Sequence, residues 1–209
     1  MVNAFSPFGF RDYLAGSGGA GTFAQHSYKI ASGNATAIFR GDPVSPVVAP
    51  ATGYIKQAVP GTTVIAGIFE GCSYLSTSQK RTIWMNYWPG SDASNDVDAY
   101  VFDDPNAQFV VQATGTIANI TGTLAAQTSG PQMQYAQFTA GTGNTNTQQS
   151  GAYISALATT VTYPFIVRDI ITQPPGGPGT DPTLANNWIV VGFNNEIMRT
   201  SGAGPTGIS

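Results

Sequence analysis

The side chain with the most versatile acid–base chemistry is His26, the only histidine of the chain. Ser27 follows it directly, so the pair resembles half of a nucleophile–base arrangement. Adjacent residues of a strand face opposite sides, however, and a serine nucleophile also needs a carboxylate in convergent geometry. The chain has no Gly-x-Ser-x-Gly elbow either. We therefore expect a structural or surface histidine, no catalytic residue and no enzymatic activity.

Five of the eleven acidic residues lie close together and raise the question of a metal site: Asp92, Asp96, Asp98, Asp103 and Asp104. Oxygen ligands suit calcium, but the spacing lacks the Asp-x-Asp-x-Asp-Gly pattern and closing glutamate of a calcium loop. One histidine and one cysteine are too few for a zinc site. That cysteine, Cys72, is expected to be a buried thiol. We predict no metal and no cofactor.

The elements that position these aspartates are best defined around residues 98–112. Valine and aromatic residues on both sides suit a pleated, half-buried surface. Between them lie Asp103, Asp104, Pro105 and Asn106, whose types favour a turn, because Asp and Asn bond their own backbone and Pro presets φ. The pattern predicts a strand, a tight turn and a second strand paired as a hairpin. This turn accounts for Asp103 and Asp104 without the two-carboxylate chemistry of a glycosidase.

Short apolar runs separated by Gly and Pro continue along the whole chain, and no helical periodicity of useful length appears. Residues 132–139 alternate, and residues 188–193 form a continuous apolar run suited to a core strand. This pattern predicts an all-β fold, a β-sandwich or barrel of jelly-roll-like type with an extended N-terminal arm. The expected organisation is an arm over residues 1–24, a single β-domain over 25–199 and a flexible tail over 200–209.

The predicted arm contains three aromatic residues, Phe5, Phe8 and Phe10, followed by Arg11 and a glycine-rich run over 16–21. Three such rings within six residues are too apolar to remain in water, and the glycine run is too flexible to pack them by itself. Two interpretations stay open. The rings enter the core of their own domain, or they anchor in a neighbouring subunit.

Composition limits the partners. The net charge is −3, and the eight basic residues are scattered, which gives no electrostatic footprint for nucleic acid. No segment has the length and apolarity to span a bilayer, and the N-terminus lacks the pattern of a signal peptide. We expect a soluble protein made in a reducing cytoplasm, with no nucleic-acid or membrane partner. A surface of neutral polar groups suits a molecule largely covered by neighbours.

Five segments carry a resemblance to known proteins: 6–11, 28–44, 67–74, 87–90 and 99–113, the last of which contains the predicted turn. In this order they resemble a family of tailed-bacteriophage virion structural proteins described as capsid decoration or cement proteins. They cover most of the first hundred-odd residues. The second half matches only in character, and the proline-rich segment 174–179 departs from the family.

The resemblance implies a non-enzymatic protein on the exterior of the phage head, assembled in the bacterial host cytoplasm, which ties neighbouring major capsid protein subunits together. It further implies a homo-oligomer, with a trimer favoured and a dimer as the other option. In this interpretation Phe5, Phe8, Phe10 and Arg11 contact the capsid or a neighbouring subunit.

The alternative is a virion module that binds carbohydrate or another host-surface component. Exposed aromatic side chains on a β-sandwich stack on sugar rings, and the candidates are Tyr74, Trp84, Tyr87 and Trp88. A β-sandwich hydrolase that depends on His26 is a third hypothesis, for which we expect no turnover.

Overall fold

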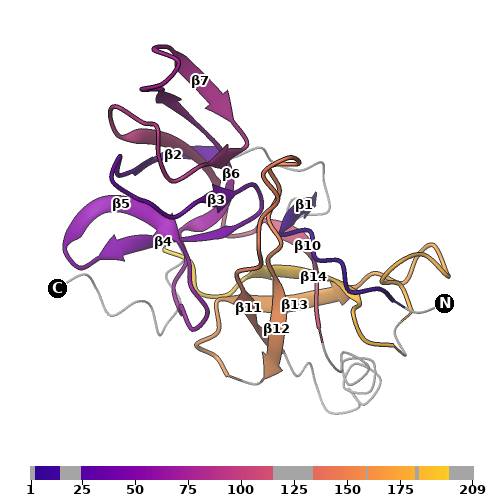
Figure 1. Ribbon diagram of the computed structural model, residues 1–209. Coiled ribbons are helices and arrows are strands. Elements are labelled where there is room, and N and C mark those ends of the chain that lie inside the picture. Colours follow the sequence, from indigo (N-terminus) through magenta and orange to yellow (C-terminus); the bar gives the residue numbers. More distant parts are fainter. Residues whose placement is uncertain (1–2, 15–24, 115–133, 159, 182–183, 198–209) are drawn as a thin grey trace.

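The computed structural model describes residues 3–14, 25–114, 134–158, 160–181 and 184–197, and every regular element among them is a strand or a turn (Figure 1). The all-β prediction of a sandwich or barrel is therefore confirmed. The strands form two large sheets and one small one. Apart from β1, one large sheet takes its strands from the first half of the chain and the other from the second half. This arrangement differs from a jelly roll, in which successive strands alternate between the two sheets.

The first sheet closes into a barrel. Its strands are β2 (Gln25–Ile30), β4 (Pro43–Val48), β5 (Ala51–Gln57), β6 (Gly67–Leu75), β7 (Thr82–Met85) and β9 (Val97–Phe102). Their order is β4-β5-β2-β9-β6-β7, and an additional β4–β6 pairing closes the ring. Alternation along β9 places Val97, Ala99 and Val101 in the barrel core. Two short strands, β3 (Ile38–Phe39) and β8 (Tyr87–Trp88), add the fully buried Trp88 to that core.

The second sheet contains β1 (Arg11–Leu14), β10 (Gln108–Gln112), β11 (Tyr135–Thr139), β12 (Tyr153–Ala158), β13 (Phe165–Ile170) and β14 (Trp188–Phe193). Its order is β1-β10-β14-β13-β11-β12, and a bridge from Ala113 to Ile154 in β12 draws its two ends together. The core of this half is built from phenylalanine rings on four different strands. The strand predicted over 188–193 is confirmed, and the one over 132–139 is confirmed from Tyr135 onward.

A buried carboxylate holds the two halves together. Asp42 is completely buried and accepts hydrogen bonds from the Phe39 amide (2.8 Å), Gln57 Nε2 (2.8 Å) and Ser150 Oγ (2.5 Å). Gln57 ends β5 of the barrel, while Ser150 precedes β12 of the second sheet. Burial raises the pKa of Asp42, and the three donors oppose that rise. Because the carboxylate depends on donors from both halves, it fixes how the halves meet.

The N-terminal segment packs on its own chain. Phe10 is only 3% exposed and stacks on Phe165 with ring centroids 4.5 Å apart. Its backbone amide donates to Gly41 O (2.9 Å), next to the buried Asp42. Of the two interpretations left open by the sequence, the structure supports packing within the same domain. The prediction that Phe10 contacts the capsid or a neighbouring subunit is therefore wrong, because its ring lies in the core.

The neighbouring rings of this segment are less buried. Phe8 packs edge-on against Trp188, whereas Phe5 packs edge-on against Tyr153 and stays 52% exposed. The predicted glycine-rich run over 16–21 and the predicted tail over 200–209 both lie outside the described residues.

The corner at Asp103–Asn106 is a turn but not a hairpin. The Asn106 amide donates to Asp104 Oδ1 (2.9 Å), and the Ala107 amide donates to Asp104 O (2.9 Å), as expected for the turn. However, β9 pairs with β2 and β6, while β10 pairs with β1 and β14. The hairpin prediction is therefore wrong. The turn carries the chain from the barrel into the second sheet, because each strand has its partners within its own sheet.

Replacing Ser150 by alanine tests the junction. Ser150→Ala removes one donor to the buried Asp42 carboxylate and the acceptor of the Ala152 amide. We expect the free energy of unfolding to fall by about 1–3 kcal/mol, since buried polar atoms lose their partners. Urea denaturation measures this change. The matched control is Ser155→Ala, at an exposed hydroxyl with one long hydrogen bond (3.5 Å). Equal stability of the two variants would contradict the assigned role of Asp42.

A second pair of variants tests the packing of the N-terminal segment. Phe10→Ala removes a buried ring and should lower the free energy of unfolding by about 3–5 kcal/mol. Phe5→Ala removes a half-exposed ring and should cost less than about 1 kcal/mol. Thermal or urea unfolding of both proteins measures the contrast. If Phe10→Ala were as stable as Phe5→Ala, the segment would not be part of the core in solution.

Candidate functional site

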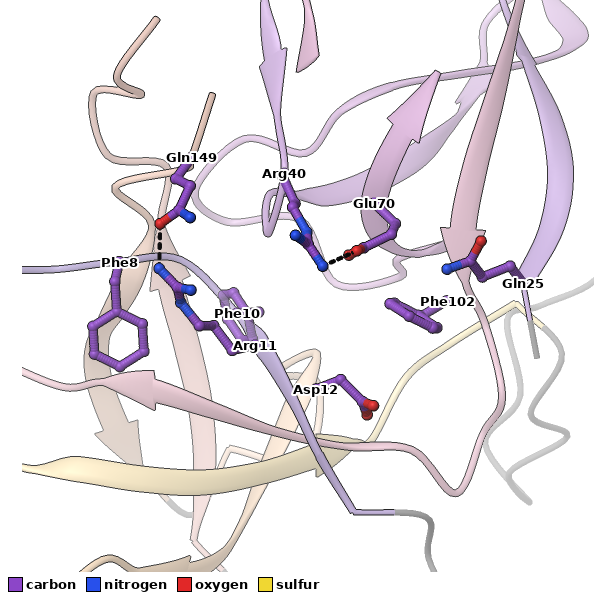
Figure 2. Close-up of a pocket in the computed structure, with 9 residues that line it drawn as sticks. All are labelled: Phe8, Phe10, Arg11, Asp12, Gln25, Arg40, Glu70, Phe102 and Gln149. Atoms are coloured by element: carbon purple, nitrogen blue, oxygen red, sulfur yellow. Dashed lines mark hydrogen bonds and ion pairs between the residues drawn. The ribbon is translucent and has the colours of Figure 1, made fainter. Parts of the chain in front are cut away.

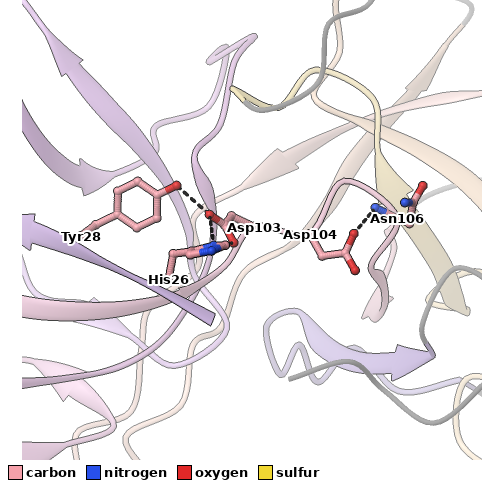
Figure 3. Close-up of polar contacts among 5 residues, drawn as sticks. All are labelled: His26, Tyr28, Asp103, Asp104 and Asn106. Atoms are coloured by element: carbon pink, nitrogen blue, oxygen red, sulfur yellow. Dashed lines mark hydrogen bonds and ion pairs between the residues drawn. The ribbon is translucent and has the colours of Figure 1, made fainter. Parts of the chain in front are cut away.

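The histidine singled out by the sequence belongs to a polar cluster at the corner (Figure 3). His26 Nδ1 lies 2.7 and 2.9 Å from the two carboxylate oxygens of Asp103, and the Tyr28 hydroxyl donates to Asp103 Oδ2 (2.7 Å). The His26 side chain is 68% exposed, whereas that of Asp103 is 1% exposed. The hydrogen bond to Asp103 and its negative charge raise the pKa of His26. Burial, followed by the same carboxylate, raises the pKa of the Tyr28 hydroxyl.

The contact with Asp103 orients the imidazole of His26, but it does not bring the ring to Ser27, the serine beside it in the sequence. The Ser27 hydroxyl donates to Asp98 Oδ1 (3.4 Å) instead of approaching His26. The sequence suggested that Asp103 caps the turn. Instead, its carboxylate accepts hydrogen bonds from two side chains of β2, His26 and Tyr28. The contact ties the first barrel strand to the point where β9 leaves the barrel, so its role is to hold the corner.

The other aspartates of the acidic group have separate partners. Asp92 accepts from the Ser76 and Thr77 hydroxyls (2.5 and 2.8 Å), which lower its pKa. Asp96 accepts from the Tyr54 hydroxyl (2.7 Å), and Asp98 pairs with Lys29 (2.6 Å). In the part of the chain that the structure describes, no three His, Cys, Asp or Glu side chains are grouped to hold a metal ion. Cys72 is buried as expected, and burial raises the pKa of its thiol to about 12.

A cavity of about 350 Å³ lies where the barrel, β1 and the loop before β12 meet (Figure 2). Arg40 forms an ion pair with Glu70 at its wall, and Arg11 donates to Gln149 Oε1. Its remaining lining residues are Phe8, Phe10, Asp12, Gln25 and Phe102. Two arginines face two carboxylates, so the cavity has no net charge. Burial raises the pKa of Glu70, and the neighbouring Arg40 opposes that rise.

Two further hollows share walls with this cavity and extend it into a groove. One, of about 640 Å³, shares Phe8 and Gln149 and reaches Phe5 and Tyr153. The other, of about 250 Å³, shares Gln25 and Glu70 and reaches Trp84 on β7. We call the first end, around Phe5, the arm end of the groove, and the second, around Trp84, the barrel end. The groove has aromatic rings at both ends, and paired charged side chains and glutamine amides line the part between them.

The structure brings some predicted residues together and separates others. Phe5, Phe8 and Arg11 line the groove, and their predicted contact with the capsid or a neighbouring subunit stays a prediction. The four candidate aromatic residues do not form one surface. Tyr74 and Trp88 are buried, and Tyr87 stacks half-buried on Phe39. Trp84 is 70% exposed. The hypothesis that Tyr74 and Trp88 stack on sugars is wrong, because both rings fill the barrel core.

Sequence reasoning missed Arg40, Glu70 and Gln149, which complete the groove. They come from a turn, a strand and a loop far apart in the chain, so no local pattern connects them. It also missed Tyr100 as a partner of Trp84. The alternation of β9 was a usable signal, since it turns Tyr100 to the same outer face as Asp98.

The structure defines an all-β protein in which a barrel and a second sheet meet beside a groove. No family model, no curated protein and no solved structure matches this chain. Among the described residues, no helix has the length and apolarity needed to cross a membrane.

The pH response of the corner is testable because the chain has one histidine, whose NMR signals are unambiguous. We expect the pKa of His26 to lie above 6.5, the ordinary value, and to return toward it in Asp103→Asn. Because the pKa of His26 is higher in the folded protein than in the unfolded chain, the His26–Asp103 pair stabilises the folded protein below about pH 6.5. This stabilisation is lost as the pH rises through the pKa of His26 in the folded protein.

The matched control is Asp98→Asn, which removes a carboxylate bound to Lys29 and Ser27 rather than to His26. It should leave the pKa of His26 nearly unchanged. A wild-type pKa at or below 6.5, or an equal response to both variants, would contradict the contact.

Proposed function

We propose that this chain is a non-enzymatic virion structural protein that binds the outer surface of a phage head and cements neighbouring major capsid protein subunits. The proposal rests on the resemblance of its ordered segments to the cement family and on one structural observation. That observation is the exposed apolar side chains carried by the segment that packs across the second sheet. Assembly in the bacterial host cytoplasm agrees with a buried, unpaired Cys72.

The exposed side chains are Phe5 and Tyr13, which are 52% and 45% exposed. Both belong to the N-terminal segment, on either side of Arg11 at the groove. Their backbone is held by the buried Phe10, so they are presented without the entropy cost of ordering a loose arm. Burying apolar surface contributes roughly 25 cal/mol per Å², and many weak contacts on one lattice add through avidity.

The surface chemistry supports the same proposal. Only 9% of residues are charged, so self-repulsion protects the free protein poorly. Such a surface suits a protein that is covered by capsid subunits or by copies of itself. We propose a homo-oligomer, with a trimer favoured over a dimer. The mass of the purified protein in solution distinguishes these states from a monomer.

The contact is tested with a double variant, Phe5→Ala and Tyr13→Ala, which keeps Phe10 and hence the packing of the segment. We expect its affinity for undecorated heads to fall by about tenfold or more, because anchor rings carry much of the binding energy of an interface. Co-sedimentation of purified protein with heads measures the affinity. The matched control is Val161→Ala, at another exposed apolar residue (61% exposed) distant in sequence. If the double variant decorated heads as fully as the control, the assigned contact would be wrong.

A further inference from the structure

An exposed aromatic platform lies on the outer face of the barrel, at the barrel end of the groove. Trp84 is 70% exposed, yet its indole is held nearly parallel to the Tyr100 ring, with centroids 5.4 Å apart and planes 7° apart. The Tyr100 hydroxyl in turn lies 3.2 Å from Ser73 Oγ, and Ser73 pairs with Trp84 across β6 and β7. Exposed aromatic surface of this size is unfavourable in water. The platform is thus preorganised, and the described part of the chain leaves it exposed.

The surroundings of the platform are rich in neutral hydrogen-bonding groups. The hollow of about 250 Å³ beside it is lined by three amide side chains, Gln25, Asn86 and Gln148. The Asn86 backbone amide donates to Gln148 Oε1 (3.1 Å), which holds one of these amides in place. Amides both donate and accept hydrogen bonds, as do the hydroxyls of sugars.

Two carboxylates near the platform are already paired. Glu70 lies at the wall that this hollow shares with the central cavity, where Arg40 neutralises it (Figure 2). Asp98, on the same outer face, pairs with Lys29. Because both carboxylates have a cationic partner among the described residues, an uncharged ligand is favoured.

A protein partner fits these features less well. Stable protein interfaces bury about 800 Å² on each side and have an apolar centre. Leu75, 40% exposed, is the other large exposed apolar residue on this stretch of β6 and β7. One flat ring surrounded by amides instead matches a small ligand with an apolar face and polar edges.

We propose that Trp84, supported by Tyr100, binds a hexopyranose ring of an uncharged glycan. The C–H face of the sugar stacks on the free face of the indole, and the hydroxyls at the ring edge bond to Gln25 and Gln148. This site goes beyond capsid binding, since it uses the end of the groove opposite Phe5 and does not depend on that function. A head-bound protein would then carry a carbohydrate contact of its own.

The test is affinity electrophoresis of the full chain in gels that contain neutral polysaccharides: dextran, mannan, laminarin and β-1,4-xylan. We expect at least one of them to retard the wild-type protein. Trp84→Ala should weaken that binding by about tenfold or more, as loss of a central aromatic contact does. Trp84→Phe should retain part of the binding. The affinity of Tyr100→Ala should lie between those of the wild type and Trp84→Ala. Leu75→Ala, a neighbouring exposed apolar residue, is the matched control and should bind like the wild type.

Three results would overturn the proposal. The first is no retardation of the wild type by any of the four polysaccharides. The second is equal retardation of wild type and folded Trp84→Ala. The third is a folded Trp84→Ala protein that no longer binds heads, which would make the platform a protein contact. Because Trp84→Ala should decorate heads normally, failure of capsid binding and failure of glycan binding are separate outcomes.

Discussion

The buried carboxylate of Asp42 is the constraint on which the rest of the structure depends. It cannot be left without donors in the interior, and its donors come from the barrel and from the loop that leads into β12. Next to it, Gly41 approaches Phe10 so closely that an added Cβ would lie 2.9 Å from the Phe10 carbonyl oxygen. The N-terminal segment, the barrel and the second sheet therefore meet around Asp42.

Much of the fold followed from local patterns, and the errors arose where a choice of partner was needed. Alternation and continuous apolar runs identified the strand at 188–193, and Asp and Asn chemistry identified the turn after Asp103. The same chemistry does not say which strands pair, so the hairpin was wrong. Local patterns are also blurred in β6, which runs from Gly67 to Leu75 through a bulge between Phe69 and Gly71. A bulge interrupts the alternation on which the prediction relied.

The binding surface was only partly predictable for a different reason. The aromatic N-terminal segment is visible in the sequence, and its composition left core packing and partner contact both open. Phe10 takes the first role, since its ring is buried, whereas Phe5 stays 52% exposed and open to the second. Trp84 and Trp88 are four residues apart and equally apolar. Only the assembled barrel shows that Trp88 fills its core while Trp84 lies outside it. The two proposed contacts therefore use opposite ends of the groove, Phe5 at the arm end and Trp84 at the barrel end.

The central claim, attachment to the exterior of a phage head, is tested most directly by electron microscopy of undecorated heads incubated with the purified protein. The account predicts added density on the outer surface, at junctions between major capsid subunits, with a fixed number of copies per junction. Heads that show no added density at saturating protein, or density confined to the interior or the tail, would contradict it.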